Sequence, residues 1–168
     1  QTPSSVIIDT PAGQVTAYAY YDNNDELQVS FDNVPSYIET INQVVSIPEL
    51  GEVHYDVAFG GAFYAFVDAD KYQISCHANN TEQLIDLGRK IKHAIVAHGQ
   101  PQHPIEQDLS FLYGTIFYSQ KTTNATSHSR HVCIFADGEV DRSPTGTGVS
   151  ARAALLNKYQ PQDKRFTI

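Results

Sequence analysis

The first third of the chain alternates short apolar runs with clusters of polar turn residues, a pattern typical of β-strands. In one run Leu27, Val29 and Phe31 alternate with polar residues, which predicts a strand with a single apolar face. The polar cluster of residues 22–25 before it predicts a hairpin turn. The strands expected in this region cover residues 6–8, 15–21, 27–31 and 37–47.

The most apolar stretch is residues 53–67, and the pair Gly60-Gly61 interrupts it. Paired glycines within a strand pattern indicate a bulge or a close approach of another backbone, although a place in the lining of a site stays open. Further strands are expected at residues 109–119 and 131–135, with a polar surface loop between them.

A first helix is predicted after residue 80. Asn80 is the expected N-cap, with Gln83 three residues later as in a capping box. Helical spacing then places four residues on one face, and Gly99 ends the helix. Those four residues are Leu84, Gly88, Ile91 and Ile95.

A second helix is predicted to begin with Ser143 as N-cap and Pro144 as its first residue. Its expected buried face carries Val149, Ala153 and Leu156. Strands, a helix, a few more strands and a last helix make an α+β domain. Neither a repeat nor a linker divides the chain, so residues 1–168 are expected to form one unit.

Composition narrows the possible functions. The 168 residues carry a net charge of −8, and an acidic surface argues against binding to nucleic acid. No apolar run is long enough to cross a membrane, and the seven histidines form no metal-binding pattern. Cys76 and Cys133 are too few for a disulfide framework; one structural bridge stays open, but we expect buried free thiols and a cytoplasmic location. Because the chain starts at Gln1, we expect a processed chain or a fragment.

Residues 141–148, Asp-Arg-Ser-Pro-Thr-Gly-Thr-Gly, are the most informative segment for chemistry. At a helix start the backbone N–H groups of Thr145, Gly146 and Thr147 would lack internal partners, and the helix dipole favours an anion there. The glycines would let a small ligand approach the backbone. Asp141 could bind an ammonium group of the same ligand. The loop therefore predicts a site for an α-amino acid, although an ordinary Ser-Pro helix start stays open.

The same segment resembles the second active-site motif of the proline racemase family, which includes 4-hydroxyproline epimerases and trans-3-hydroxy-L-proline dehydratases. Three further segments resemble motifs of that family in the right order. They are Asp9-Thr10-Pro11-Ala12-Gly13, Asn33-Val34-Pro35-Ser36 and Asp56-Val57-Ala58-Phe59-Gly60-Gly61-Ala62-Phe63-Tyr64-Ala65.

The resemblance implies a fold of the diaminopimelate epimerase type, in which two similar lobes each wrap a mixed β-sheet around a central helix. It implies that the active site lies between the lobes, and that each lobe offers a helix N-terminus to the substrate carboxylate. It also implies an enzyme without a cofactor. The partners to expect are a hydroxyproline substrate, the missing lobe of the same protein, and a second copy in a homodimer.

Two departures from the racemase pattern shape the expected activity. Thr145 stands where racemases have a cysteine, and a hydroxyl is a poor acid or base near neutral pH. The family's first cysteine, in a Cys-Gly-His-type motif, is absent, and neither Cys76 nor Cys133 takes its place. The chain is therefore expected to be inactive alone.

With threonine at this position, the motif resembles that of the dehydratase branch of the family. The leading hypothesis is therefore that the chain is one lobe of a trans-3-hydroxy-L-proline dehydratase, which eliminates water to give pyrroline-2-carboxylate. The alternatives are a proline racemase or 4-hydroxyproline epimerase, and a non-catalytic amino-acid-binding homologue. Thr145 either hydrogen-bonds the departing hydroxyl or caps the helix. The residues expected to contact the substrate are Asp141, Thr145, Gly146 and Thr147.

Overall fold

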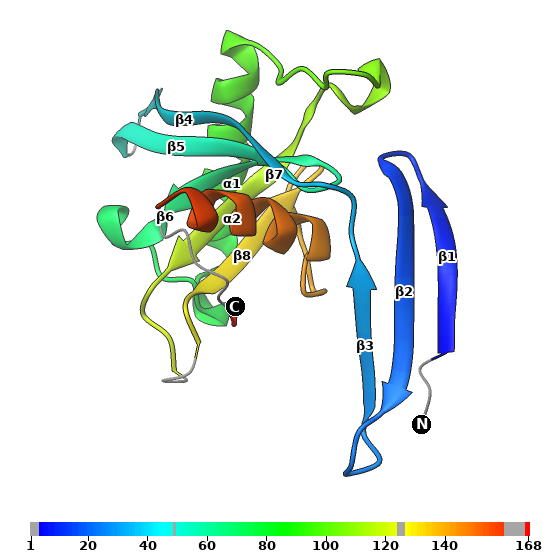
Figure 1. Cartoon of the computed structure of the whole chain (residues 1–168). Helices are drawn as coiled ribbons and strands as arrows, with labels where there is room; N and C mark the ends of the chain where they lie inside the picture. The colour runs from blue at the N-terminus through cyan, green and yellow to red at the C-terminus, as the bar shows by residue number, and fades with distance from the viewer. Residues whose placement is uncertain (1–3, 49, 124–126, 160–166) are drawn as a thin grey trace.

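The computed structural model describes residues 4–48, 50–123, 127–159 and 167–168. Their strands form a three-stranded and a six-stranded sheet, and two α-helices pack on the larger one (Figure 1). The predicted α+β class, a mixed sheet packed around a helix, is confirmed.

The smaller sheet is antiparallel in the order β1-β2-β3 and stands beside the rest of the molecule (Figure 1). Its strands are β1 (Ser4–Thr10), β2 (Gly13–Tyr21) and β3 (Leu27–Asp32). Pairing puts Val6 opposite Ala17 and Ala17 opposite Phe31, so one face of the sheet is apolar. We call this the apolar face; its large side chains are Val6, Ile8, Val15, Tyr21, Leu27, Val29 and Phe31. All of these except Val15 are at least 43% exposed.

The larger sheet has the order β4-β5-β6-β7-β8-β9. Its strands are β4 (Tyr37–Ile47), β5 (Gly51–Phe59), β6 (Phe63–Asp68), β7 (Leu112–Ser119), β8 (Arg130–Phe135) and β9 (Glu139–Val140). Neighbours are antiparallel except β6 and β7, which are parallel. A parallel pair needs a crossover, and helix α1 (Thr81–His98) supplies it. Short 3₁₀ turns occupy Ala69–Tyr72, Ala78–Asn80 and Gln107–Leu109.

Helix α1 confirms the predicted apolar face, because all four of the expected residues are buried, together with Leu87. Gly99 ends the helix as predicted. The capping box is wrong: the Asn80 side chain makes no capping bond and instead donates to the Gln83 side chain. The preceding 3₁₀ turn explains this, because it already puts Asn80 outside the extended conformation that an N-cap requires.

Helix α2 (Gly146–Tyr159) begins later than predicted, so Ser143 is not its N-cap and Pro144 is not its first residue. The Asp141 carboxylate accepts the N–H of Ser143 and holds this segment in a turn. Thr145 has a left-handed backbone with φ of 49°, so helical geometry cannot begin before Gly146.

The predicted buried face of α2 is only partly right. Leu156 is buried, but Val149 and Ala153 are only half-buried. The face that packs on the sheet carries Gly148, Ala151, Arg152, Leu155 and Leu156.

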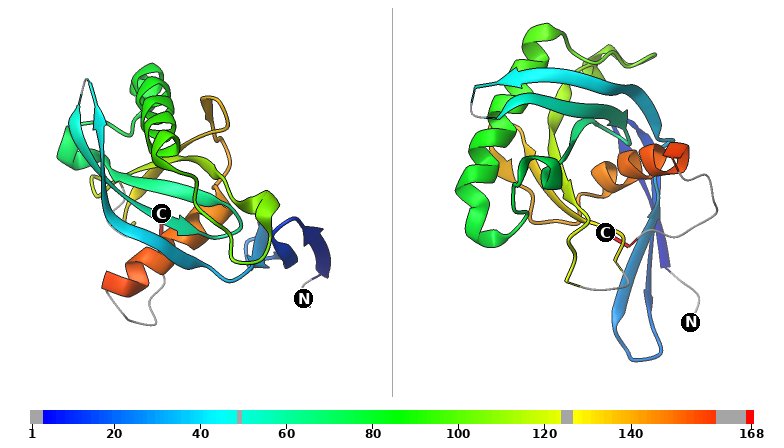
Figure 2. Two further views of the ribbon diagram at one scale, coloured as in Figure 1. Left: turned by 90° about the horizontal axis from the view of Figure 1, so that it is seen from above. Right: turned by 90° about the vertical axis from the view of Figure 1, so that its left-hand side faces the viewer.

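The helices cover opposite faces of the larger sheet, with α1 on one side and α2 on the other (Figure 2). Alternation along β6 divides its side chains between them: Phe63 and Ala65 pack in the core under α1, whereas Tyr64 and Phe66 pack under α2. This alternation turns the ring of Tyr64 towards α2.

Gly60-Gly61 divides the predicted apolar stretch into β5 and β6. A Cβ on Gly60 would lie 2.3 Å from the carbonyl oxygen of Thr147 and 2.5 Å from the amide nitrogen of Ala151. The expected close backbone approach is therefore confirmed, and it lets the first turn of α2 rest on the β5–β6 turn.

Candidate active site

A pocket of about 890 Å³ lies where the smaller sheet meets the first turn of α2. One wall is polar and consists of Asp141, Ser143, Thr145, Gly146 and Thr147. The other is mainly apolar and includes Val15, Phe31, Ala62, Leu109, Phe111 and Tyr113. All four site residues expected from the sequence therefore line one pocket.

Among the described residues, the start of α2 offers this pocket backbone N–H groups that have no partner within the helix. The first N–H groups of a helix have no partner within it, and here they belong to Gly146, Thr147 and Gly148. The expectation that Thr145 would offer a free N–H is wrong, because that group donates to Ser143 Oγ at 3.0 Å. The later start of α2 moves the set of N–H groups without a helical partner one residue along the chain, and such groups can bind an anion.

Asp141 is ionised and held in place beside these donors. Its Oδ1 accepts the N–H of Ser143 at 2.8 Å, and its Oδ2 accepts the hydroxyl of Thr145 at 2.7 Å. Partial burial raises the pKa of Asp141, but the hydrogen bonds from Ser143 and Thr145 outweigh it and lower the pKa below its ordinary value. Each carboxylate oxygen still has a lone pair for a ligand ammonium group.

Thr145 precedes the first helical residue, but its hydroxyl does not cap the helix. The hydroxyl donates to Asp141, and only the Thr145 carbonyl oxygen joins the helix, by accepting the N–H of Val149 at 2.8 Å. A β-branched residue with φ of 49° is strained, and such strain gathers at functional sites.

The space beside Gly146 is filled by protein. A Cβ on Gly146 would lie 2.6 Å from Cζ of Phe31, so the glycine makes room for an aromatic ring from the smaller sheet. Sequence reasoning placed Phe31 on an apolar strand face but gave no sign that its ring meets the start of α2.

Tyr64 is a second residue of the pocket that sequence reasoning missed. It is 2% exposed, and its hydroxyl oxygen lies 2.7 Å from Thr147 Oγ1. Burial raises the pKa of Tyr64, so its hydroxyl stays neutral. The ring centroids of Tyr64 and Tyr113 are 5.7 Å apart in a T-shaped arrangement, and Tyr113 stacks on Phe135. Strand alternation was the one available signal, since it separates Tyr64 from the neighbouring Phe63.

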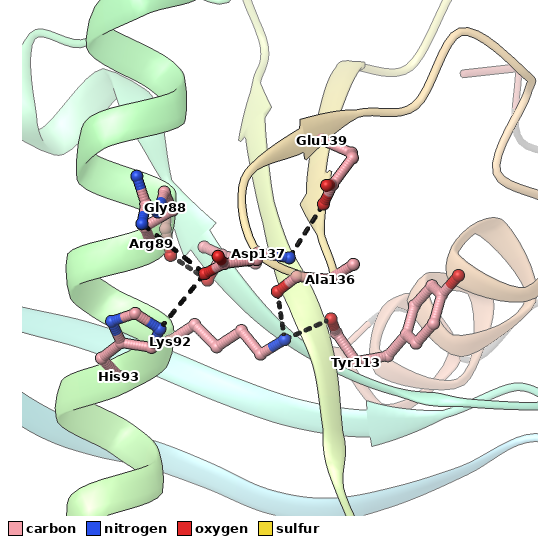
Figure 3. Close-up of polar contacts among 9 residues, drawn as sticks. Gly88, Arg89, Lys92, His93, Tyr113, Ala136, Asp137 and Glu139 are labelled. Atoms are coloured by element: carbon pink, nitrogen blue, oxygen red, sulfur yellow. Dashed lines mark hydrogen bonds and ion pairs between the residues drawn. The ribbon is translucent and has the colours of Figure 1, made fainter.

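Lys92 on α1 anchors the backbone of the pocket wall at Tyr113. Its Nζ donates to the carbonyl oxygens of Tyr113 at 3.0 Å and Ala136 at 2.6 Å (Figure 3). Burial lowers the pKa of Lys92. The nearby ion pair between Arg89 and Asp137, at 3.6 Å, is exposed and contributes little stability.

Cys76 and Cys133 are free and buried, as predicted, and neither lines the pocket. Burial raises the pKa of Cys76 to about 11 and that of Cys133 to about 12, so neither forms a thiolate readily. Among the described residues, no group of three or more His, Cys, Asp or Glu side chains could hold a metal ion. No helix in that part of the chain is long and apolar enough to cross a membrane.

Comparison with known proteins decides the family, because the model of the proline racemase family matches residues 1–160. The chain belongs to the proline racemase family. A protein of Shewanella pealeana is 61% identical over 154 residues, which are 92% of this chain and 44% of that protein. A trans-3-hydroxy-L-proline dehydratase of Colwellia psychrerythraea is 50% identical over 157 residues, which are 94% of this chain and 44% of the relative.

The fold is also similar to that of solved structures from this family. A crystal structure of a hydroxyproline epimerase from Agrobacterium vitis, with trans-4-hydroxy-L-proline bound, superimposes with a TM-score of 0.87 at 28% identity. The match covers 98% of this chain and 47% of the epimerase. The chain thus spans less than half the length of the proline racemase family members that it matches.

Proposed function

We propose that this chain is part of a trans-3-hydroxy-L-proline dehydratase and supplies the portion of the site that binds the carboxylate and nitrogen of the substrate. The observation that carries the proposal is the Thr145 hydroxyl, held by Asp141 at the start of α2. The family resemblance implies a cysteine at this position in racemases, which need a base on each side of Cα. Dehydratase names among similar family members support the choice.

Each described group has a role in water elimination. The N–H groups of Gly146 and Thr147 bind the substrate carboxylate and stabilise the charge that develops there when the Cα proton leaves. Asp141 pairs with the ring nitrogen. The base that removes the Cα proton is a thiolate from the part of the protein outside this chain. No cofactor takes part.

Thr145 assists the leaving group. When the substrate nitrogen pairs with Asp141, the Thr145 hydroxyl gives up that partner and turns its hydrogen to the departing β-oxygen. The Cα–H and Cβ–O bonds break, a Cα=Cβ bond forms, and the hydroxide leaves as water with a proton passed through the site from solvent. The enamine product, which carries the Cα=Cβ bond, then isomerises to the cyclic imine form of pyrroline-2-carboxylate.

We further propose that the rest of the polypeptide packs on the apolar face of β1–β3. An exposed apolar sheet face is costly in water, and Phe31 joins this face to the pocket. Packing there would close the pocket and bring the missing base to it. That residues 1–168 form a single lobe stays a prediction, as do a homodimer and a cytoplasmic location; the two free thiols suit a reducing compartment.

The test is to incubate the full natural polypeptide with trans-3-hydroxy-L-proline and to measure pyrroline-2-carboxylate. Turnover of about 1–1000 per second is expected. Inversion at Cα of trans-4-hydroxy-L-proline, without loss of water from the 3-hydroxy isomer, would make the protein an epimerase instead. Binding without turnover would make it a non-catalytic homologue. The 168-residue chain alone is expected to be inactive, because it lacks the Cys-Gly-His-type motif.

A further inference from the structure

Two hydroxyl groups from distant parts of the chain meet at the polar wall of the pocket. Tyr64 on β6 and Thr147 on α2 lie 83 residues apart in sequence, and their hydroxyl oxygens are 2.7 Å apart. Both residues line the pocket. Within the described residues, neither hydroxyl has a second hydrogen-bond partner.

Such a pair has one hydrogen to spare. Two hydroxyl groups carry two hydrogens, and the bond between them uses only one. The second hydrogen needs an acceptor, and because Tyr64 is buried and Thr147 only half-buried, the pocket that both residues line is the place to find one. An anionic ligand at the start of α2 would accept it.

The surroundings decide which hydroxyl faces the ligand. The Thr147 methyl group lies 2.8 Å from the place where a Cβ on Gly61 would stand, so the methyl is directed at that glycine. Tyr64 is the more deeply buried partner, at 2% exposure. Thr147 also belongs to the helical turn that carries the free N–H groups.

We infer that Tyr64 is a positioning residue. Its hydroxyl donates to Thr147 Oγ1, and the Thr147 hydroxyl therefore donates its own hydrogen to the carboxylate of the ligand. The carboxylate then receives a side-chain donor besides the backbone N–H groups of α2. The inference rests on the proposed function in taking a cyclic amino acid as the ligand, with its carboxylate at the start of α2.

The test compares Tyr64→Phe, Thr147→Val and the double variant in the full natural polypeptide. Binding of L-proline is measured by calorimetry, because L-proline lacks the hydroxyl that would be eliminated. Pyrrolidine, which has the ring nitrogen but no carboxylate, is the second probe. Tyr55→Phe is the matched control: it removes a hydroxyl from β5, outside the pocket.

Thr147→Val should weaken L-proline binding about 10- to 100-fold, the effect of losing a hydrogen bond to a charged group. Tyr64→Phe should weaken it less, about 3- to 10-fold, because Thr147 keeps its hydroxyl but loses its orientation. The double variant should match Thr147→Val, since Tyr64 acts through Thr147. Pyrrolidine binding should not change in any variant, and Tyr55→Phe should bind L-proline as the wild type does.

Additive effects of the two substitutions would overturn the inference, as would equal weakening of L-proline and pyrrolidine, which indicates a merely structural role. A larger effect of Tyr64→Phe than of Thr147→Val would reverse the assigned direction and refute it. Absence of L-proline binding by the wild type would also refute it. If L-proline binds as expected but trans-3-hydroxy-L-proline is not dehydrated, the proposed function fails and this inference stands.

Discussion

Replacing Gly60 with alanine should displace the start of α2 without changing any side chain that lines the pocket. The new Cβ would lie 2.3 Å from the Thr147 carbonyl oxygen and 2.5 Å from the Ala151 nitrogen. Both are backbone atoms, so no side chain can rotate away. To reach 3.0 Å, the shortest separation that a Cβ tolerates, the helix must move by at least about 0.7 Å.

That displacement sets the expected magnitudes. Overpacking of this kind costs about 1–3 kcal/mol of stability. A shift approaching 1 Å at a catalytic group costs about 100-fold in rate, so kcat/KM for trans-3-hydroxy-L-proline should fall by about that factor. A loss of rate of about 100-fold corresponds to about 2.7 kcal/mol, so Gly60→Ala is expected to lower activity and stability by comparable free energies.

The matched control is Gly51→Ala, in the turn between β4 and β5. A Cβ there would meet nothing within 4 Å, but φ is +73°. The variant should lose about 1–2 kcal/mol from backbone strain alone and keep its activity.

Urea denaturation measures the free energy of unfolding of both variants, and steady-state kinetics of the full polypeptide measures kcat/KM. If Gly60→Ala kept kcat/KM within about twofold of the wild type, the claim that this glycine positions the start of α2 for binding would be refuted.

Three further predictions concern the site and the thiols. Asp141→Asn should raise KM about tenfold, because the variant loses the charged partner of the substrate nitrogen. The pKa of Asp141 is lowered in the folded state, so its carboxylate stabilises the fold above about pH 4, and this stabilisation disappears as the pH falls through the lowered pKa. Urea denaturation should therefore show the unfolding free energies of wild type and variant converging in acid. Thr145→Cys should gain slow inversion at Cα of L-proline, which is measured by deuterium uptake from D₂O. Efficient inversion by the wild type would contradict the dehydratase proposal. Cys76 and Cys133 should resist thiol reagents at about pH 8 until the chain unfolds, and rapid labelling of the folded chain would contradict their burial.

The sequence by itself determined the local elements and the segments that carry chemistry. Alternation in residues 27–31 predicted an apolar strand face, and helical spacing predicted four buried residues of α1. Both depend on periodicity, which neighbouring residues record without reference to the rest of the chain. The loop that begins at Asp141 also indicated the family and contained the residues of the pocket's polar wall.

Only the tertiary structure decided how that loop is used. The strained turn at Thr145, which moves the helix start to Gly146, depends on the Asp141 carboxylate accepting two hydrogen bonds at once. The ring of Phe31 over Gly146 and the bond between Tyr64 and Thr147 join segments that are far apart in sequence. Periodicity tells which face of a strand or helix is buried but not what it meets there, because the partner is chosen by packing of the whole domain.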